Sequence, residues 1–205
     1  MIHLAALIAL ATSAVAAQPT SVPVQLQPAP DSADRREALR GLVSCVAKAR
    51  PRWARQTLAL PYLSDAQAGS AAEVLNGRDS CQTNHEVDMT FRTSTLVGTL
   101  AEHFIQTQLD PDAIARLQSS LNTAAPLNAS EDFALCVAAR NPNAARDLAL
   151  SALGSEAEAQ SAKLLVNQVP QCTRPEETMT VDLQALRALT ATALYRAITR
   201  AASSH

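Results

Sequence analysis

A segment bracketed by two cysteines occurs twice in this chain of 205 residues. The first copy runs from Cys45 to Cys81 and the second from Cys136 to Cys172, so both cysteines are displaced by 91 positions. Aligned at this offset, the copies share 13 identical residues in 37 positions. Composition alone gives an alanine-rich chain roughly three or four identities, so common descent of the two halves is the better explanation.

Each copy predicts the same first two helices. Leu39, Leu42 and Val46 recur at helical spacing, which indicates a first helix with a cysteine near its end. Pro51 and Pro142 follow short interruptions and can occupy the first turn of a second helix, where a missing amide hydrogen is harmless.

Two further helices are expected in each copy. Ser64 with Gln67, and Ser155 with Glu158, fit the capping box that starts a third helix. A longer fourth helix follows the second cysteine, and an extra helix capped by Asp110 joins the copies. Because apolar and polar residues almost nowhere alternate, we predict an all-α fold of about nine helices, a tandem duplication of a disulfide-closed module.

The first 31 residues differ from the rest. Residues 1–17 contain an apolar run followed by small residues, which predicts a signal peptide, the alternative being a buried first helix. Residues 18–31 contain four prolines and predict a flexible Pro/Gln-rich tether. The predicted organisation is completed by helical module 1 at 32–109, a joining helix at 110–127 and helical module 2 at 128–205.

Four cysteines in an exported chain of this size indicate two disulfides. All three connectivities respect the repeat. We favour Cys45 with Cys81 and Cys136 with Cys172, because each module then closes on itself. A four-cysteine metal site is the alternative, but the C-x-x-C and Cys/His spacings of such sites do not occur.

Basic residues are concentrated in the first module. Between residues 35 and 55, seven cations face a single glutamate, although the whole chain has a net charge of −2. If the first two helices form a hairpin, these cations and Trp53 can share a surface for anions. The alternative is a solvated face that pairs with acidic residues of the second module. The candidate anion or partner surface comprises Arg36, Arg40, Lys48, Arg50, Arg52, Trp53 and Arg55.

Arg55 and Arg146 occupy the same place in the two copies. An arginine kept in both halves is expected to bridge helices by bonding carboxylates or carbonyls. Trp53 lacks a counterpart, so it is either a core filler of the first module or a surface anchor for a partner.

Catalytic motifs for the common hydrolase, metalloprotease and phosphate-binding classes do not occur. His85, Glu86 and Asp88 lie together in a polar connection and are the only grouping that suggests acid/base chemistry, a solvated loop being the simpler interpretation. We therefore expect neither a cofactor nor a metal site.

The pattern C-V-A, then proline with A-R, then L-A-L and S-x-A-x-A before a second cysteine resembles uncharacterised exported bacterial proteins with cysteine-bracketed helical repeats. The resemblance covers most of the mature chain. It implies a secreted all-helical fold and supplies no activity.

We therefore expect a periplasmic or secreted, non-enzymatic interaction protein without a membrane span in its mature part. The expected partner is a protein or an anionic envelope component, and no nucleic acid. One alternative is a carrier that holds a small apolar or amphiphilic ligand between helices. Another is a hydrolase that uses His85, Glu86 and Asp88.

Overall fold

The computed structural model describes residues 24–76, 81, 92–108, 116–173 and 180–202. These residues form nine α-helices, one short 3-10 helix and two strands of three residues each, so the described chain is almost entirely helical. In chain order the elements are β1 (Gln25–Gln27), α1 (Ala33–Ala49), α2 (Pro51–Ala59), α3 (Asp65–Asn76), α4 (Thr93–Gln108), α6 (Leu117–Thr123), α7 (Ala129–Arg140), α8 (Pro142–Leu150), α9 (Glu156–Val166), η1 (Val169–Gln171), β2 (Thr180–Asp182) and α10 (Leu183–Ala202).

Local sequence signals set the starts of several helices. Helices α2 and α8 begin at Pro51 and Pro142, which confirms the predicted starts. The side chain of Asn141 caps α8 by accepting the amide of Ala144 at 3.2 Å. These helix starts therefore depend on residues within one turn of the helix.

The serine half of each predicted capping box is present, whereas the reciprocal half is not. The hydroxyl oxygen of Ser64 accepts the amide of Gln67 at 3.2 Å, and that of Ser155 accepts the amide of Glu158 at 3.2 Å. In both turns the reciprocal bond goes one residue further back than in the standard box, to the residue before the serine.

That preceding residue has the same unusual backbone in both turns. Leu63 has φ 60° and Gly154 has φ 72°, and both lie in the left-handed region. Gln67 Oε1 accepts the amide of Leu63 at 3.0 Å, and Glu158 Oε2 accepts the amide of Gly154 at 2.7 Å. Glycine adopts this conformation freely, whereas leucine is strained in it.

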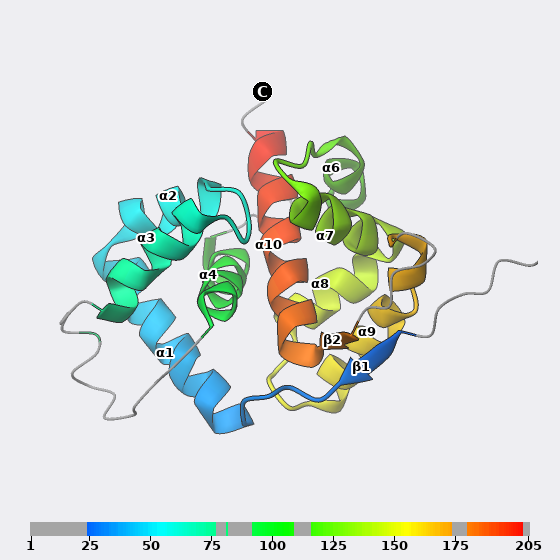
Figure 1. Cartoon of the computed structure of the whole chain (residues 1–205), viewed down its shortest axis with the longest axis horizontal. Helices are drawn as coiled ribbons and strands as arrows, with labels where there is room; N and C mark the ends of the chain where they lie inside the picture. Colours follow the sequence, from blue (N-terminus) through cyan, green and yellow to red (C-terminus); the bar gives the residue numbers. More distant parts are fainter. Residues whose placement is uncertain (1–23, 77–80, 82–91, 109–115, 174–179, 203–205) are drawn as a thin grey trace, which may run out of the picture.

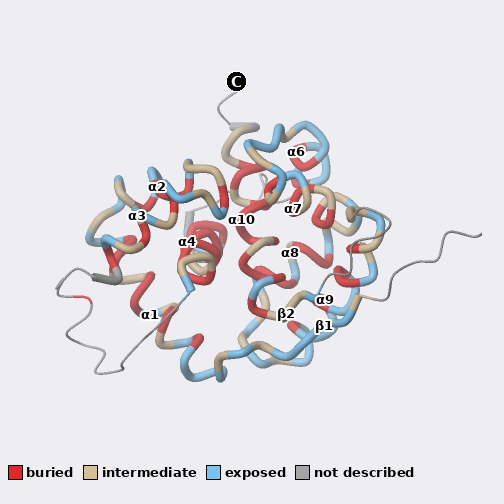
Figure 2. The backbone as a smooth tube through the Cα atoms, in the orientation of Figure 1, coloured by how far each residue is buried: buried red, intermediate tan, exposed pale blue. Residues whose placement is uncertain are grey.

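Helix α10 lies at the centre of the molecule, between α1 to α4 on one side and α6 to α9 on the other (Figure 1). Buried residues follow most of α10 and of α4, which packs against it (Figure 2). Gly98 permits this close contact, because a Cβ at that position would lie 2.3 Å from both Cα and Cβ of Ala188. The fourth helices of the two halves, α4 and α10, therefore cross with their backbones in contact.

Two disulfides close the halves. Cys45 bonds Cys81, and Cys136 bonds Cys172, each across a sequence separation of 36. These are the two pairs that the sequence analysis favours, and no described cysteine is free. Closing a loop of this length stabilises a fold by about 4 kcal/mol through the entropy of the unfolded chain.

The predicted tether is wrong for its described part. Strand β1 lies within residues 18–31 and pairs in parallel with β2, with Leu26 opposite Val181. The side chain of Gln184 also donates to Asp31 at 3.0 Å. Proline cannot donate a backbone hydrogen bond to a neighbouring strand. The residues between the prolines of this segment can, so a short strand forms there. This pairing carries the start of the chain to the second half (Figure 1).

Some predictions fall partly or wholly outside the described residues. The signal peptide at 1–17 and the cap Asp110 are among them. Of the joining helix predicted at 110–127, the structure describes α6, whose buried face is formed by Leu117, Ser120 and Leu121.

The predicted modules at 32–109 and 128–205 do not have separate cores in the described chain. Leu42 and Leu58 of the first belong to the same buried cluster as Leu148 and Leu194 of the second. Because α10 contacts helices of both halves, burial of its surface joins the halves into one folding unit.

Candidate binding groove

The predicted basic surface is only partly at the surface. Its member Arg36 is 6% exposed and makes two hydrogen bonds to the carboxylate of Glu158, so its placement on an exposed surface is wrong. A guanidinium can be buried when a carboxylate accepts two of its N–H groups. Solvent does reach Lys48, Arg52 and Arg55.

Trp53 is half-buried at the edge of the core, consistent with a filler of the first half. Its indole N–H donates to the carbonyl of Ser70 on α3 at 3.2 Å, and the guanidinium of Arg50 lies 5.6 Å from its ring centre. Arg146 bonds Asp147 on its own helix at 2.8 and 2.9 Å, so this contact does not provide the expected helix bridge.

A buried ionic network connects the two halves, and its centre is Arg187 of α10. The Nε of Arg187 donates to Glu102 of α4 at 2.8 Å, and one Nη donates to Glu158 of α9 at 2.8 Å. Arg40 of α1 bonds the other oxygen of Glu102 at 3.0 Å, while Arg36 bonds Glu158. Three arginines thus neutralise two buried carboxylates from four helices.

The carboxylate of Glu158 remains ionised in this setting. Its burial alone would raise its pKa, but the hydrogen bond from Arg36, the amide of Gly154 and the charges of Arg187 and Arg36 together hold the pKa below its usual value. The network is therefore an assembly of full charges that are paired with each other.

Helix α10 also caps two other helices with arginine. Arg187 donates to carbonyls at the end of α8, and Arg196, further along α10, donates to carbonyls at the end of α2. Carbonyls at helix ends lack partners within the helix, so these arginines replace the missing donors. The carbonyls belong to Ala149 and Ser151 for Arg187, and to Leu58 and Leu60 for Arg196.

Glu131 of α7 positions the turn between α2 and α3. Its carboxylate pairs with Arg196 at 2.9 Å and accepts the backbone amide of Tyr62 at 2.8 Å. The side chain of Asn128 donates to the carbonyl of Tyr62 at 2.7 Å. Both backbone polar groups of Tyr62, the residue before Leu63, are thereby tied to the second half, which fixes the position of Leu63.

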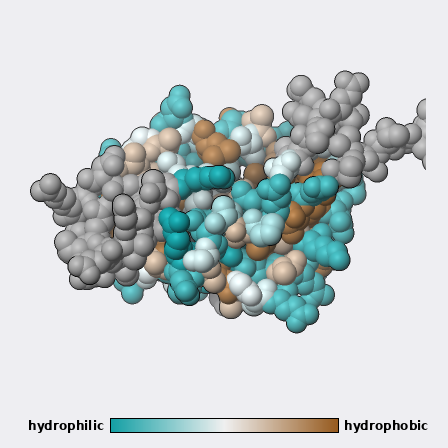
Figure 3. Space-filling view, turned by 60° about the horizontal axis from the view of Figure 1, so that its bottom comes forward, coloured by the Kyte–Doolittle hydropathy of each residue, from teal (hydrophilic) through white to brown (hydrophobic). Residues whose placement is uncertain are grey.

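A groove of about 750 Å³ opens to solvent beside this turn. Its apolar lining includes Leu63 from the first half, Phe133 of α7 and Leu189 of α10, and strand β2 contributes Val181. The coloured part of the face in Figure 3 is mostly hydrophilic, with hydrophobic side chains in separate patches. The groove combines the size of a ligand site with walls from both halves.

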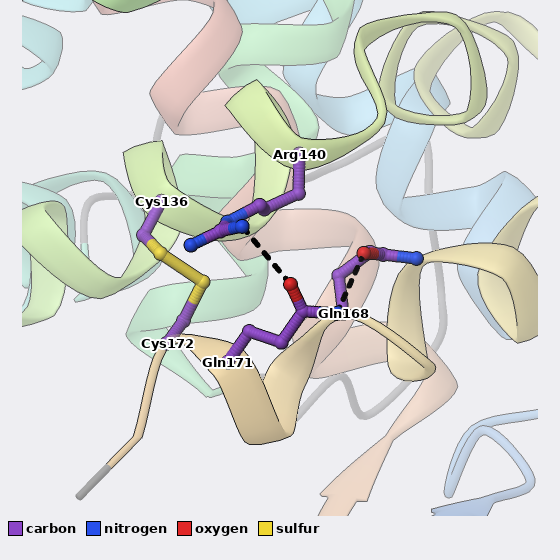
Figure 4. Close-up of a disulfide and its surroundings, with 5 residues drawn as sticks. All are labelled: Cys136, Arg140, Gln168, Gln171 and Cys172. Carbon is purple, nitrogen blue, oxygen red and sulfur yellow. Dashed lines mark hydrogen bonds between the residues drawn. A yellow bond between two sulfur atoms is a disulfide. The ribbon is translucent and has the colours of Figure 1, made fainter.

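The second disulfide fixes one wall of the groove. Cys172 lines it and is bonded to Cys136 of α7. Arg140 of α7 reaches over to Gln171 and donates to its side-chain oxygen at 3.0 Å, and Gln171 in turn bonds Gln168 at 3.4 Å (Figure 4). The 3-10 helix before Cys172 is therefore held to α7 by one covalent and one polar link.

Charged groups lie along the groove. Arg92 pairs with Asp182 at 3.4 Å, and Asp182 also accepts the amide of Ala185 at 2.6 Å as the cap of α10. Asp132, in the first turn of α7, is exposed and has no ion-pair partner within the described ranges. Burial raises the pKa of the Tyr62 phenol, and the negative charge of Asp182 adds to this, so the phenol stays neutral.

A smaller space of about 300 Å³ lies between α1 and α4 and is lined by Arg40, Glu102 and His103. Burial lowers the pKa of His103, and the charge of Lys48 lowers it further, so the imidazole is neutral at pH 7. Both oxygens of Glu102 are already bonded to arginines. The other carboxylate that lines this space, that of Glu37, is exposed and pairs with Arg40 at 3.6 Å.

His85, Glu86 and Asp88 lie outside the described residues, so the structure offers no geometry for the hydrolase hypothesis. In the chain that the structure does describe, no three His, Cys, Asp or Glu side chains are grouped as metal ligands would be. Nor does any described helix have the length and apolar character needed to cross a membrane.

The pairing of the α10 arginines with buried glutamates was not predicted from the sequence. The available signal was an arginine inside a helix that is apolar on nearly every side, since such a helix is buried and its charges must be paired. Arg187 is only 2% exposed, in agreement with that rule.

Comparisons of the chain with protein-family models, with curated proteins and with solved structures found no match.

Proposed function

We propose that this protein is an exported, non-enzymatic helical binding protein built from two halves of common descent. The groove between the halves is the site that holds its partner. The observation that carries this proposal is the groove of about 750 Å³ with apolar side chains from both halves.

Equivalent positions support common descent. The disulfides have the same separation, and Leu63 and Gly154, 91 positions apart, share a left-handed turn. After a one-residue slip, Gly98 corresponds to Ala188, and these two residues meet where α4 crosses α10. Contact between equivalent residues is what a twofold relation between the halves predicts.

Export is supported by the disulfides and by residues 1–17. Two disulfides indicate an oxidising compartment, such as the periplasm or the extracellular space. The apolar run at the start of the chain has the features of a signal peptide, and cleavage there would leave β1 near the start of the mature protein.

Binding, as opposed to catalysis, is supported by the groups that line the groove. Its described lining offers apolar surface and charges, and its cysteine, Cys172, is consumed by a disulfide. Nucleophilic catalysis by a hydroxyl usually needs a histidine base beside it, and the described lining contains no histidine.

The geometry favours a partner in the groove over a small ligand between helices. The space of about 300 Å³ between α1 and α4 is lined mainly by polar side chains, among them Arg40, Glu102 and His103, which do not suit an apolar ligand. Two other spaces between packed helices have volumes of only about 20 Å³ and about 0 Å³. The larger of them is lined by the network residues Arg36, Glu102 and Arg187. A space of this size holds at most one water molecule.

Site-specific photo-crosslinking tests the proposed function. A photo-crosslinking residue is placed at Ser130, which lines the groove, and in a matched variant at Gln160 on the exposed face of α9. After exposure to an envelope extract of the source cells, we expect a saturable adduct from position 130 only. Equal adducts from both positions, or none from position 130 in a folded protein, would contradict the proposal.

A further inference from the structure

Leu63 is an exposed and strained residue in the wall of the groove. It is 55% exposed, the most exposed of the large hydrophobic residues in the described chain, and its φ is 60°. A left-handed backbone brings the leucine Cβ close to the following carbonyl oxygen, so the conformation is unfavourable for this residue. Exposure of the side chain is unfavourable as well, because its apolar surface stays in water.

The second half shows how the same turn is made without this penalty. Gly154 occupies the equivalent place with φ 72° and the same amide hydrogen bond, and glycine has no Cβ to clash. The turn itself therefore does not require a leucine. Residues held in strained conformations occur preferentially at functional sites, where the strained side chain has a use.

The surroundings of Leu63 indicate what that use is. Tyr62, the preceding residue, is held by Glu131 and Asn128, so the leucine is presented on a rigid turn. Phe133 lines the same groove and offers further apolar surface. A preorganised apolar anchor of this kind loses little conformational entropy when a partner binds.

Charge identifies a second element of the partner. Asp132 lines the groove, is exposed, and has no ion-pair partner among the residues that the structure describes. Asp182, by contrast, is paired with Arg92. A carboxylate without a partner among these residues favours a cation close to the apolar contact.

The openness of the groove indicates the class of partner. Small apolar ligands bind in sites that bury most of their surface, whereas this groove opens to solvent. An open groove covers one side of its ligand, which suits a segment of a polypeptide whose other side remains attached to a folded partner.

On the basis of the proposed function, we infer that Leu63 is the recognition residue of the groove and that its ligand is a polypeptide segment with an apolar side chain next to a basic one. The apolar side chain packs on Leu63 and Phe133, and the basic side chain pairs with Asp132. The strain at Leu63 is retained because the leucine binds the partner.

Leu63→Gly separates binding from folding, because it removes the anchor and the strain together. Gly154→Leu is the matched control, since it places a strained leucine in the equivalent turn away from the groove. The probe is a phage-displayed library of random twelve-residue peptides, selected on the wild-type protein. The measurements are the affinities of the selected peptides for each variant and the midpoint of chemical denaturation.

We expect the selected peptides to carry an apolar residue next to lysine or arginine. Their affinity should fall at least tenfold for Leu63→Gly and about threefold for Asp132→Asn, values within the range of interface hot spots and of exposed ion pairs. Leu63→Gly should keep or raise the denaturation midpoint. Gly154→Leu should lower the midpoint and leave the affinity unchanged.

Several results would overturn the inference. They are peptides that bind Leu63→Gly as tightly as the wild type, selected peptides rich in acidic residues, and selection without enrichment. A dimer of the wild type that Leu63→Gly dissociates would replace the peptide by a second copy of the chain. If the crosslinked adduct at Ser130 persists in Leu63→Gly, the role of Leu63 fails while the proposed function stands.

Discussion

Replacing Arg187 by methionine removes the guanidinium at the centre of the ionic network. The side chain is 2% exposed and bonds two buried carboxylates, those of Glu102 and Glu158. Methionine has a similar length and no charge, so the substitution leaves the space largely filled. The carbonyls at the end of α8 also lose their donors.

The expected loss follows from these contacts. Removing one member of a buried ion pair destabilises a protein by about 3 to 5 kcal/mol, because the remaining charge stays buried. Two carboxylates are affected here, but Glu102 retains Arg40 and Glu158 retains Arg36. We expect a loss of about 4 kcal/mol in the free energy of unfolding. For a chain of this size that lowers Tm by about 8 to 16 °C.

Urea denaturation of Arg187→Met at pH 7, with the disulfides intact, measures this loss. Arg146→Met is the matched control, because Arg146 forms an exposed pair with Asp147 and should contribute less than about 1 kcal/mol. At acid pH the deficit of Arg187→Met should shrink, since protonation discharges the carboxylate of Glu158. Equal stability of the two variants at pH 7 would refute the reasoning.

Three further predictions concern the crossing of α4 with α10, the second disulfide and the response to acid. Gly98→Ala forces the helices apart, because its Cβ would lie 2.3 Å from Ala188, and should lower the free energy of unfolding by about 3 kcal/mol in denaturant titrations. An unchanged midpoint would mean that the helices do not cross so closely. The double replacement of Cys136 and Cys172 by alanine should destabilise by up to about 4 kcal/mol, which calorimetry without reductant can measure against the wild type. A loss below 1 kcal/mol would contradict loop closure as the source of the stability that this disulfide supplies. Finally, the lowered pKa of Glu158 gives stability that is present above the ordinary pKa of glutamate and lost as the pH falls through the folded-state pKa. Glu158→Gln should therefore be less stable at pH 7 and show a flatter acid limb, and an unchanged slope would contradict this assignment.

Much of the helical fold could be predicted because its signals are local. The starts at Pro51 and Pro142 and the serine caps of α3 and α9 depend on hydrogen bonds within one turn of chain. The repeat is compatible with all three disulfide connectivities, and the observed one could be favoured only because each half then closes on itself. Strand β1 was missed because its partner β2 is more than 150 residues away in the sequence.

Prediction was poorest for the charged residues. The basic run at residues 35–55 indicated an exposed surface, yet Arg36 is buried against Glu158, 122 residues further along. For Arg36 the structure shows the alternative arrangement, in which a basic residue of the first module pairs with an acidic residue of the second. Whether an arginine is solvated or buried depends on which helix lies opposite it, and local sequence does not contain that information.

The sequence by itself determined the class of helices, where several of them begin, and which cysteines can close each half. These features depend on backbone geometry and on side chains within a few positions of one another. Only the tertiary structure decided that α4 and α10 meet through Gly98, that Arg187 lies between two carboxylates, and that Leu63 reaches a groove lined by Phe133. Such contacts join residues far apart in the chain, so they form only when helices from different parts of the chain pack against each other.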